Sequence, residues 1–85
     1  MSSVRHATLP VIGLGCGGAG ARIIERALTA LAGVRSVYVN PVTEAAYVAF
    51  DPAKCQLPVL VDAIELAGYA TDTHRVSFKE DLVAP

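Results

Sequence analysis

A glycine-rich segment around Cys16 contains the residue types in this sequence best suited to chemistry. Residues 13–20 read GLGCGGAG, after an apolar run and before a stretch with helical periodicity. At the N-terminal end of a helix, the dipole and the free backbone N–H groups favour a thiolate and lower its pKa. Thiolates are the ligands that soft metal ions such as Cu(I) prefer. Cys16 is therefore a candidate soft-metal ligand or redox-sensitive thiol.

The same glycines also fit Gly-x-Gly-x-x-Gly, the pattern of a turn that holds a dinucleotide pyrophosphate at a helix N-terminus. A six-stranded Rossmann domain does not fit into 85 residues. In addition, Asn40 stands where an acidic residue would close the second strand. These two departures disfavour a dinucleotide site.

Length and composition indicate one small domain that folds without a metal. The 85 residues allow a single domain over residues 1–85, with its core at about 7–78 and a polar tail at 79–85. Hydrophobic residues make up 53% and charged residues 18%, which is enough apolar material for a core without disulfides or a structural metal. The formal net charge of -1, with Lys and Arg scattered singly, disfavours nucleic acid as a partner.

The sequence shows no membrane or export segment. No apolar run approaches the ~20 residues of a transmembrane helix, and the N-terminal residues lack the hydrophobic centre of a signal peptide. We therefore expect a cytoplasmic protein with no membrane insertion. In that reducing compartment Cys16 and Cys55 would remain thiols.

Periodicity predicts six secondary-structure elements in the order βαββαβ. A strand at residues 8–12 precedes a helix at 19–32, and residues 34–40 and 45–51 form a hairpin. A second helix begins near Pro58, and a last strand covers residues 72–78. This order predicts an α+β, ferredoxin-like sandwich with two helices on one face of a four-stranded antiparallel sheet. The expected core positions are Ile24, Ala27, Leu28, Leu31, Val37, Val39, Val48, Phe50, Leu60, Ala63, Ile64 and Ala67.

Framework motifs spread over about residues 9–73 point to a known family. They are Gly33-Val34, Val37-x-Val39-Asn40, Asp51-Pro52 and Ala63-Ile64-x-x-Ala67-Gly68-Tyr69. In this combination the chain resembles the heavy-metal-associated domain of soluble copper chaperones, mercury-binding proteins and the N-terminal parts of copper-pumping P-type ATPases. The resemblance implies that a soft metal ion such as Cu(I) is bound or trafficked. It also implies a metal-donor or metal-acceptor partner such as a P-type ATPase.

The metal motif of that family, Gly-Met-Thr/Ser-Cys-x-x-Cys, is altered in this chain. Gly13 and Cys16 match the motif, while Leu14 replaces the methionine and Gly15 the hydroxyl residue. Ala19 occupies the place of the second cysteine. A two-thiolate site of the usual kind therefore cannot form within one chain.

The spacing around this motif also departs from the family. Counted back from Leu28, the second cysteine would fall at Gly20 rather than Ala19, so we expect a loop that is one residue longer. The alternative is a bulge in the helix at residues 23–24. We favour the loop because Gly17, Gly18 and Gly20 absorb an insertion at little steric cost.

The candidate site therefore centres on one thiol. The resemblance places Tyr69 next to the metal, where its ring would shield the site, although capping the core is an equally good role for it. The metal ligand is Cys16, and the candidate residues of the ligand loop are Gly15, Gly17, Gly18, Ala19, Gly20 and Tyr69.

Two functions remain open at this point. In the first, Cys16 binds the metal together with a thiolate from another chain, which is either a second copy in a homodimer or a partner protein. In the second, Cys16 is a remnant, and the domain is a metal-free interaction or regulatory module that binds a partner or small ligand at the glycine-rich loop. A replaced cysteine at position 19 would also explain the sequence. Catalysis is not expected because no nucleophile and base or carboxylate pair stands together.

The remaining candidate ligands lie away from Cys16. Cys55 follows the third strand and should lie at the opposite pole, roughly 20 Å from Cys16, as a solvated or partly buried loop residue. His6 precedes the first expected strand and His74 lies in the last one, and both are expected to be exposed. His6 and Cys55 share a pole, which leaves a weak secondary site there.

Overall fold

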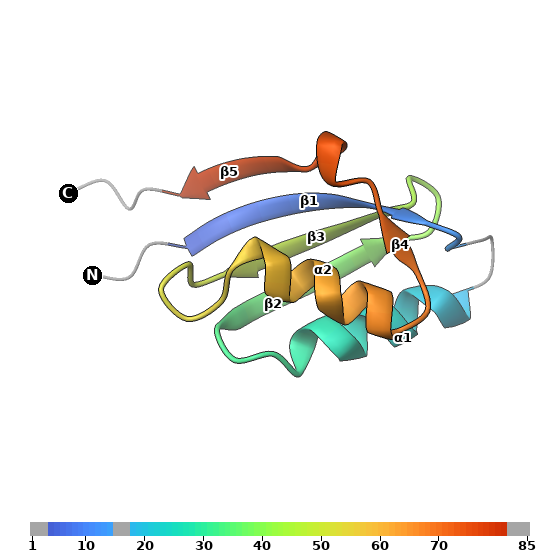
Figure 1. The fold of residues 1–85 in the computed structure, drawn as a ribbon, viewed down its shortest axis with the longest axis horizontal. Helices are drawn as coiled ribbons and strands as arrows, with labels where there is room; N and C mark the ends of the chain where they lie inside the picture. The colour runs from blue at the N-terminus through green and yellow to red at the C-terminus, as the bar shows by residue number, and fades with distance from the viewer. Residues whose placement is uncertain (1–3, 15–17, 82–85) are drawn as a thin grey trace.

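Two helices pack on one face of an antiparallel sheet (Figure 1). The structure, a computed structural model, describes residues 4–14 and 18–81. Its elements are β1 (Val4–Ile12), α1 (Gly18–Thr29), β2 (Val34–Asn40), β3 (Ala45–Phe50), α2 (Leu57–Leu66), β4 (Ala70–Thr71), a 3-10 turn η1 (Thr73–Arg75) and β5 (Ser77–Asp81). Strands β2, β3 and β1 lie in that order, and β4 and β5 both pair with the far edge of β1. The ferredoxin-like arrangement is confirmed, with one more strand than expected.

The strand expected at residues 72–78 is mostly wrong: only residues 77–78 belong to a strand, and the additional strand β4 lies just before this segment. β4 pairs with Val11–Ile12 of β1, and β5 pairs with Val4–Thr8, so that the two occupy one edge of β1 in succession. Between them the Asp72 carboxylate accepts a hydrogen bond from the His74 backbone N–H at 3.1 Å and turns the chain into η1. His74 therefore lies in η1, not in a strand as predicted. Residues 79–81, expected in a polar tail, belong to β5.

β1 is longer than its apolar core suggests. It begins at Val4 rather than near residue 8, so His6 lies inside the strand and not before it. Ala7, Leu9 and Val11 alternate toward the core and are nearly inaccessible to solvent. The residues between them face the other side of the sheet.

α1 confirms the predicted helical stripe but ends three residues early. Ile24 and Leu28 are buried, and Ala27 is half-buried. The helix ends at Thr29, whose hydroxyl donates to the Glu25 carbonyl oxygen at 2.6 Å. It is α-helical from Gly18 onward with no π turn, which disagrees with a bulge at residues 23–24.

The hairpin and the second helix follow the sequence pattern. Val39, Val48 and Phe50 point into the core, whereas Tyr38 is 60% exposed and pairs with Tyr47 across the strands. In α2, where Pro58 lies in the first turn, the buried residues are Leu60, Ala63 and Ile64. Val37, Leu31 and Ala67 are half-buried. No helix in the described part of the chain is long and apolar enough to cross a membrane.

Candidate functional site

Three loops meet at the end of the molecule where β1 leads toward α1, and we call this end the loop pole. It comprises residues 12–14, the beginning of α1, the hairpin turn at 41–44 and residues 68–69. The Val11 backbone N–H donates to the Glu44 carbonyl oxygen at 2.8 Å and ties the hairpin turn to the end of β1. Cys16, Gly15 and Gly17 lie outside the described residues, so the structure defines the two ends of the candidate loop.

Tyr69 contacts both ends of this loop. A Cβ built on Gly20 would lie 2.7 Å from the Tyr69 hydroxyl oxygen, 3.0 Å from the Leu14 carbonyl oxygen and 3.3 Å from Leu14 Cδ1. A Cβ on Gly13, which has a φ of +91°, would lie 3.9 Å from the Tyr69 ring. The half-buried tyrosine is thus packed between the residues that lead into and out of the loop. The sequence contains no direct sign of the contact with Gly20, because it depends on how α1 meets the end of α2.

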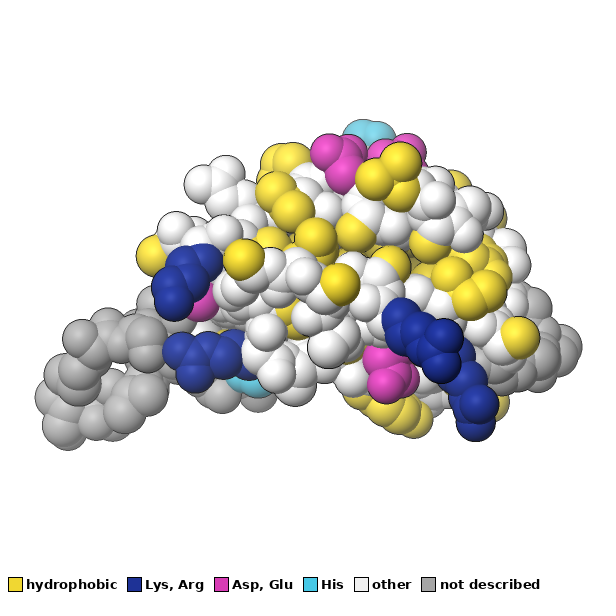
Figure 2. All heavy atoms as spheres, turned by 90° about the horizontal axis from the view of Figure 1, so that it is seen from below, with side chains coloured by type: hydrophobic (Ala, Val, Ile, Leu, Met, Phe, Trp, Pro, Cys, Tyr) yellow, Lys and Arg dark blue, Asp and Glu magenta, His cyan; other side chains and the backbone are white. Residues whose placement is uncertain are grey.

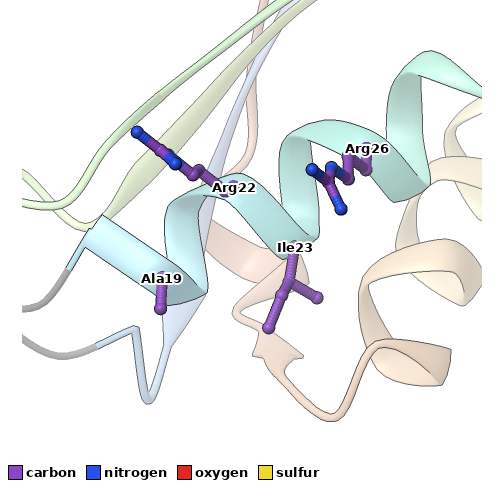
Figure 3. Close-up of a pocket in the computed structure, with 4 residues that line it drawn as sticks. All are labelled: Ala19, Arg22, Ile23 and Arg26. Carbon is purple, nitrogen blue, oxygen red and sulfur yellow. The ribbon is translucent and has the colours of Figure 1, made fainter.

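Ala19 and Gly20 have opposite surroundings. Gly20 is buried, and a side chain there would meet Tyr69 and Leu14, whereas Ala19 is exposed. Ala19 lines a shallow hollow on α1 together with Arg22, Ile23 and Arg26 (Figure 3). Of the two positions that the sequence offered for a second cysteine, only position 19 therefore has room for its side chain.

Leu14, which stands where the family has methionine, belongs to the core. It is buried and packs with the apolar residues of β1, α1 and α2. Leucine keeps the apolar character of the methionine, so this substitution preserves the packing under the loop.

The electrostatic surroundings at the start of α1 favour an anion. The first turn of the helix contains no acidic residue, and Arg22 is exposed on the next turn, while the exposed Glu25 and Arg26 lie further along and offset each other. Positive partial charge at a helix N-terminus, together with a nearby guanidinium group, stabilises negative charge in its neighbourhood. A thiolate next to this end of α1 would gain from both.

Cys55 differs from the expectation of a solvated or partly buried residue, because it lies in the core. Only 2% of it is exposed, and its Sγ donates a weak hydrogen bond to the Gln56 carbonyl oxygen at 3.9 Å. Burial raises the pKa of this thiol from 9.0, although the hydrogen bond opposes the shift. A buried thiol with a raised pKa is a poor metal ligand at neutral pH.

The histidines do not complete a second site. His6 borders a hollow on the outer face of the sheet beside Tyr38 and Tyr47, whereas Cys55 lies in the core on the helix side. The secondary site expected from these two residues is therefore wrong, because the sheet separates them. His74 is exposed in η1. Over residues 4–14 and 18–81, no three His, Cys, Asp or Glu side chains gather as a metal cage would require.

Comparison with known proteins agrees with this geometry. The family model of the heavy-metal-associated domain matches residues 8–70. Over 66 residues, or 78% of the chain, the sequence is 42% identical to a protein described as a probable copper-transporting ATPase, PacS, from Synechococcus elongatus. The chain spans only 9% of that ATPase.

Two solved structures have the same fold. Oxidized MerP from Ralstonia metallidurans superposes with a TM-score of 0.77 at 33% identity, covering 81% of this chain and 94% of MerP. The CopZ metallochaperone superposes with a TM-score of 0.74, also at 33% identity, covering 79% of this chain and 98% of CopZ. The chain belongs to the heavy-metal-associated domain family. Metal binding and trafficking is the function of this family in general.

Proposed function

We propose that the chain binds or transfers a soft metal ion such as Cu(I) through Cys16, with a second thiolate supplied by another chain. One observation carries the proposal: the chain belongs to a metal-trafficking family, and it keeps one motif cysteine but has Ala19 in place of the other. Soft thiolates select Cu(I), and one thiolate leaves the coordination of the ion incomplete. The missing sulfur therefore has to come from outside this chain.

The described part of the loop pole supports the proposal. The start of α1 favours a thiolate, and Tyr69 packs against Gly13 and Gly20 at the two ends of the loop. Ala19 is exposed and carries only a methyl group, so it leaves this part of the surface open to an approaching partner. Together these features support a metal held at the surface, where a second protein can reach it.

Two sources of the second thiolate fit the proposal. One is Cys16 of a second copy in a homodimer that shares the metal. The other is a cysteine of a donor or acceptor protein such as a P-type ATPase, and the relative PacS is described as a copper-transporting ATPase. The proposed role is carriage in the cytoplasm rather than catalysis. The metal is cargo and is not needed for folding, because an apolar core already joins the helices to the sheet.

An anaerobic Cu(I) titration against a competing chelator tests this proposal. The native chain is compared with Cys16→Ser, and the number of chains per bound metal is measured by sedimentation equilibrium. We expect Cys16→Ser to abolish competition for Cu(I). A ratio of one metal to two chains would assign the second thiolate to another copy. Binding of one metal per chain that occurs only after a thiol-bearing partner is added would assign the second thiolate to that partner.

Cys55→Ala is the matched control, because it also removes one thiol, but a buried one at the opposite end of the molecule. It should leave the Cu(I) affinity unchanged. Negligible Cu(I) affinity in the native chain, with no change in Cys16→Ser, would reject the proposal.

A metal-free interaction module is the second candidate function. It is favoured by exposed apolar side chains at the loop pole, where Val42 is 89% exposed and Ile12 56%. Such side chains at one end of a domain are typical of a protein contact. In the same titration this function predicts no Cu(I) binding by any variant.

A further inference from the structure

The two helices present opposite charges on their exposed surfaces. α1 exposes Arg22 and Arg26, which lie one turn apart, and α2 exposes Asp62 and Glu65. None of these four side chains makes an ion pair within residues 4–14 and 18–81. Glu25 reduces the positive charge of α1 but leaves it net basic. The helix surface therefore divides into a basic and an acidic half.

Apolar side chains accompany these charges. Ile23 of α1 is 48% exposed, and Val59 and Leu66 of α2 are 44% and 89% exposed. Figure 3 shows Ile23 and Arg22 leaving α1 in different directions around the hollow that both of them line. In Figure 2, an acidic group lies at the upper border of this face and basic side chains lie below it, with apolar side chains between them. An apolar centre with a charged periphery is the usual composition of a protein interface.

A surface of this kind is complementary to itself. α1 and α2 lie side by side and run in opposite directions (Figure 1). A twofold axis lying in the interface and parallel to the helices would place α1 of one copy on α2 of the other, and the reverse contact would form at the same time. Both contacts would then pair basic with acidic side chains.

We propose that the chain forms a twofold-symmetric homodimer through this helix face, with Arg22 and Arg26 of each copy opposite Asp62 and Glu65 of the other. Arg22 lies four residues after the start of α1 and Asp62 four residues before the end of α2. Each is therefore ~6 Å from the loop-pole end of its helix. This twofold axis preserves height along the helices, and α1 begins further toward the loop pole than α2 ends (Figure 1). The two basic side chains of one copy therefore face the two acidic side chains of the other over the loop-pole halves of the helices.

The proposed dimer does not depend on Cys16. All of its contacts come from α1 and α2, and the beginnings of both α1 helices lie at the same end of the dimer. It can therefore form in the absence of metal. A metal shared between two Cys16 thiolates is a separate contact, so the metal-sharing proposal and the helix-face dimer can be tested independently of each other.

Sedimentation equilibrium of the metal-free Cys16→Ser chain tests the proposal, because this background removes metal sharing. Exposed ion pairs are individually weak, so protein should be examined from about 10 μM to about 1 mM and at low and high salt. We expect a monomer–dimer equilibrium that shifts toward monomer at high salt, since exposed pairs are screened. The dimer dissociation constant should be at least tenfold higher for the double variant R22E/R26E than for the Cys16→Ser chain, and the same increase is expected for D62K/E65K.

Mixing the two charge-reversed chains provides the decisive measurement. Each reversed helix then faces a helix of opposite charge, so a heterodimer should form where neither variant dimerises alone. R35E/K54E is the matched control, because it changes the net charge by the same amount at exposed positions outside the two helices. A chain that stays monomeric throughout, or a dimer that responds equally to R35E/K54E and is not restored by mixing, would overturn the proposal.

Discussion

Each of the two poles of the molecule contains a closely packed glycine, but the two glycines pack against different kinds of atoms. At the loop pole, Gly20 packs against the hydroxyl end of the Tyr69 side chain and against Leu14. At the opposite pole, a Cβ on Gly33 would lie 2.8 Å from Lys54 Cβ and 3.2 Å from both Cys55 Cβ and Cys55 N. Gly33 also has a φ of +89°, which a side chain rarely adopts. We call this second end the Cys55 pole.

Backbone hydrogen bonds reinforce the Cys55 pole. The Asp51 N–H donates to the Gly33 carbonyl oxygen at 2.8 Å, and the Cys55 N–H donates to the Asp51 carbonyl oxygen at 2.9 Å. The Asp51 carboxylate in turn accepts from the Ala53 N–H at 2.9 Å. Backbone atoms in such a network cannot move independently, whereas the tyrosine at the loop pole can change rotamer. One pole is therefore built for rigidity, and the other is closed by a side chain that can adjust.

Restoring a second thiol should produce the largest effect and should involve the loop pole alone. Ala19→Cys recreates Cys-x-x-Cys with Cys16, and the exposed position 19 accommodates the side chain. Because both ligands then belong to one chain, Cu(I) affinity should rise by ~10²–10⁴-fold, as measured by chelator competition. Gly20→Cys is the control. Its side chain meets Tyr69 and Leu14, so an equal gain in affinity from that variant would contradict the contrast between the two positions.

The rigidity of the Cys55 pole predicts a large loss of stability in Gly33→Ala. The positive φ costs about 1–2 kcal/mol and the overpacking about as much again, so the free energy of unfolding should fall by about 2–4 kcal/mol in urea denaturation. Gly68→Ala separates these two causes, because Gly68 has a φ of +98° and no atom within 4 Å of its Cβ position. It should lose only about 1–2 kcal/mol. Equal losses in the two variants would mean that the Cys55 pole is no tighter than an open turn.

Gly20→Ala should cost less, since its nearest neighbour is the end of a side chain. Overpacking costs about 1–3 kcal/mol, and the helix propensity of alanine returns about 1 kcal/mol, which leaves a net loss of about 1 kcal/mol. In a Tyr69→Phe background the hydroxyl is gone and only the contacts with Leu14 remain, so the same substitution should cost less by urea denaturation. An unchanged cost in both backgrounds would show that Leu14 rather than Tyr69 closes the loop pole.

The smallest expected effect is a pH dependence at the Cys55 pole. The raised pKa means that the folded state keeps the Cys55 proton at pH values where the unfolded chain loses it. This contribution to stability is fully present below pH 9.0, the unfolded value, and is lost as the pH rises from there through the folded pKa. The difference in unfolding free energy between the native chain and Cys55→Ala should therefore shrink above pH 9.0. A difference that stays constant across that range would contradict the assignment.

Local sequence patterns predicted most of the framework. The alternation around Val39 and Val48 and the spacing of Ile24 and Leu28 identified the buried faces, because side-chain periodicity follows directly from strand and helix geometry. The pairing of both β4 and β5 with one edge of β1 was not predicted. It depends on the Asp72 turn and on how much of the long β1 remains free to pair, and the second of these is a tertiary property.

For the candidate site, the sequence by itself determined the chemistry: one motif thiol at Cys16, with Ala19 in the place of the second. Only the tertiary structure decided that position 19 is open and Gly20 is closed, because the closure comes from Tyr69 and Leu14, which lie on different elements. It likewise placed Cys55 in the core and His6 on the far side of the sheet. Residue types and spacing follow from the chain alone, whereas burial and contact between distant residues follow from packing.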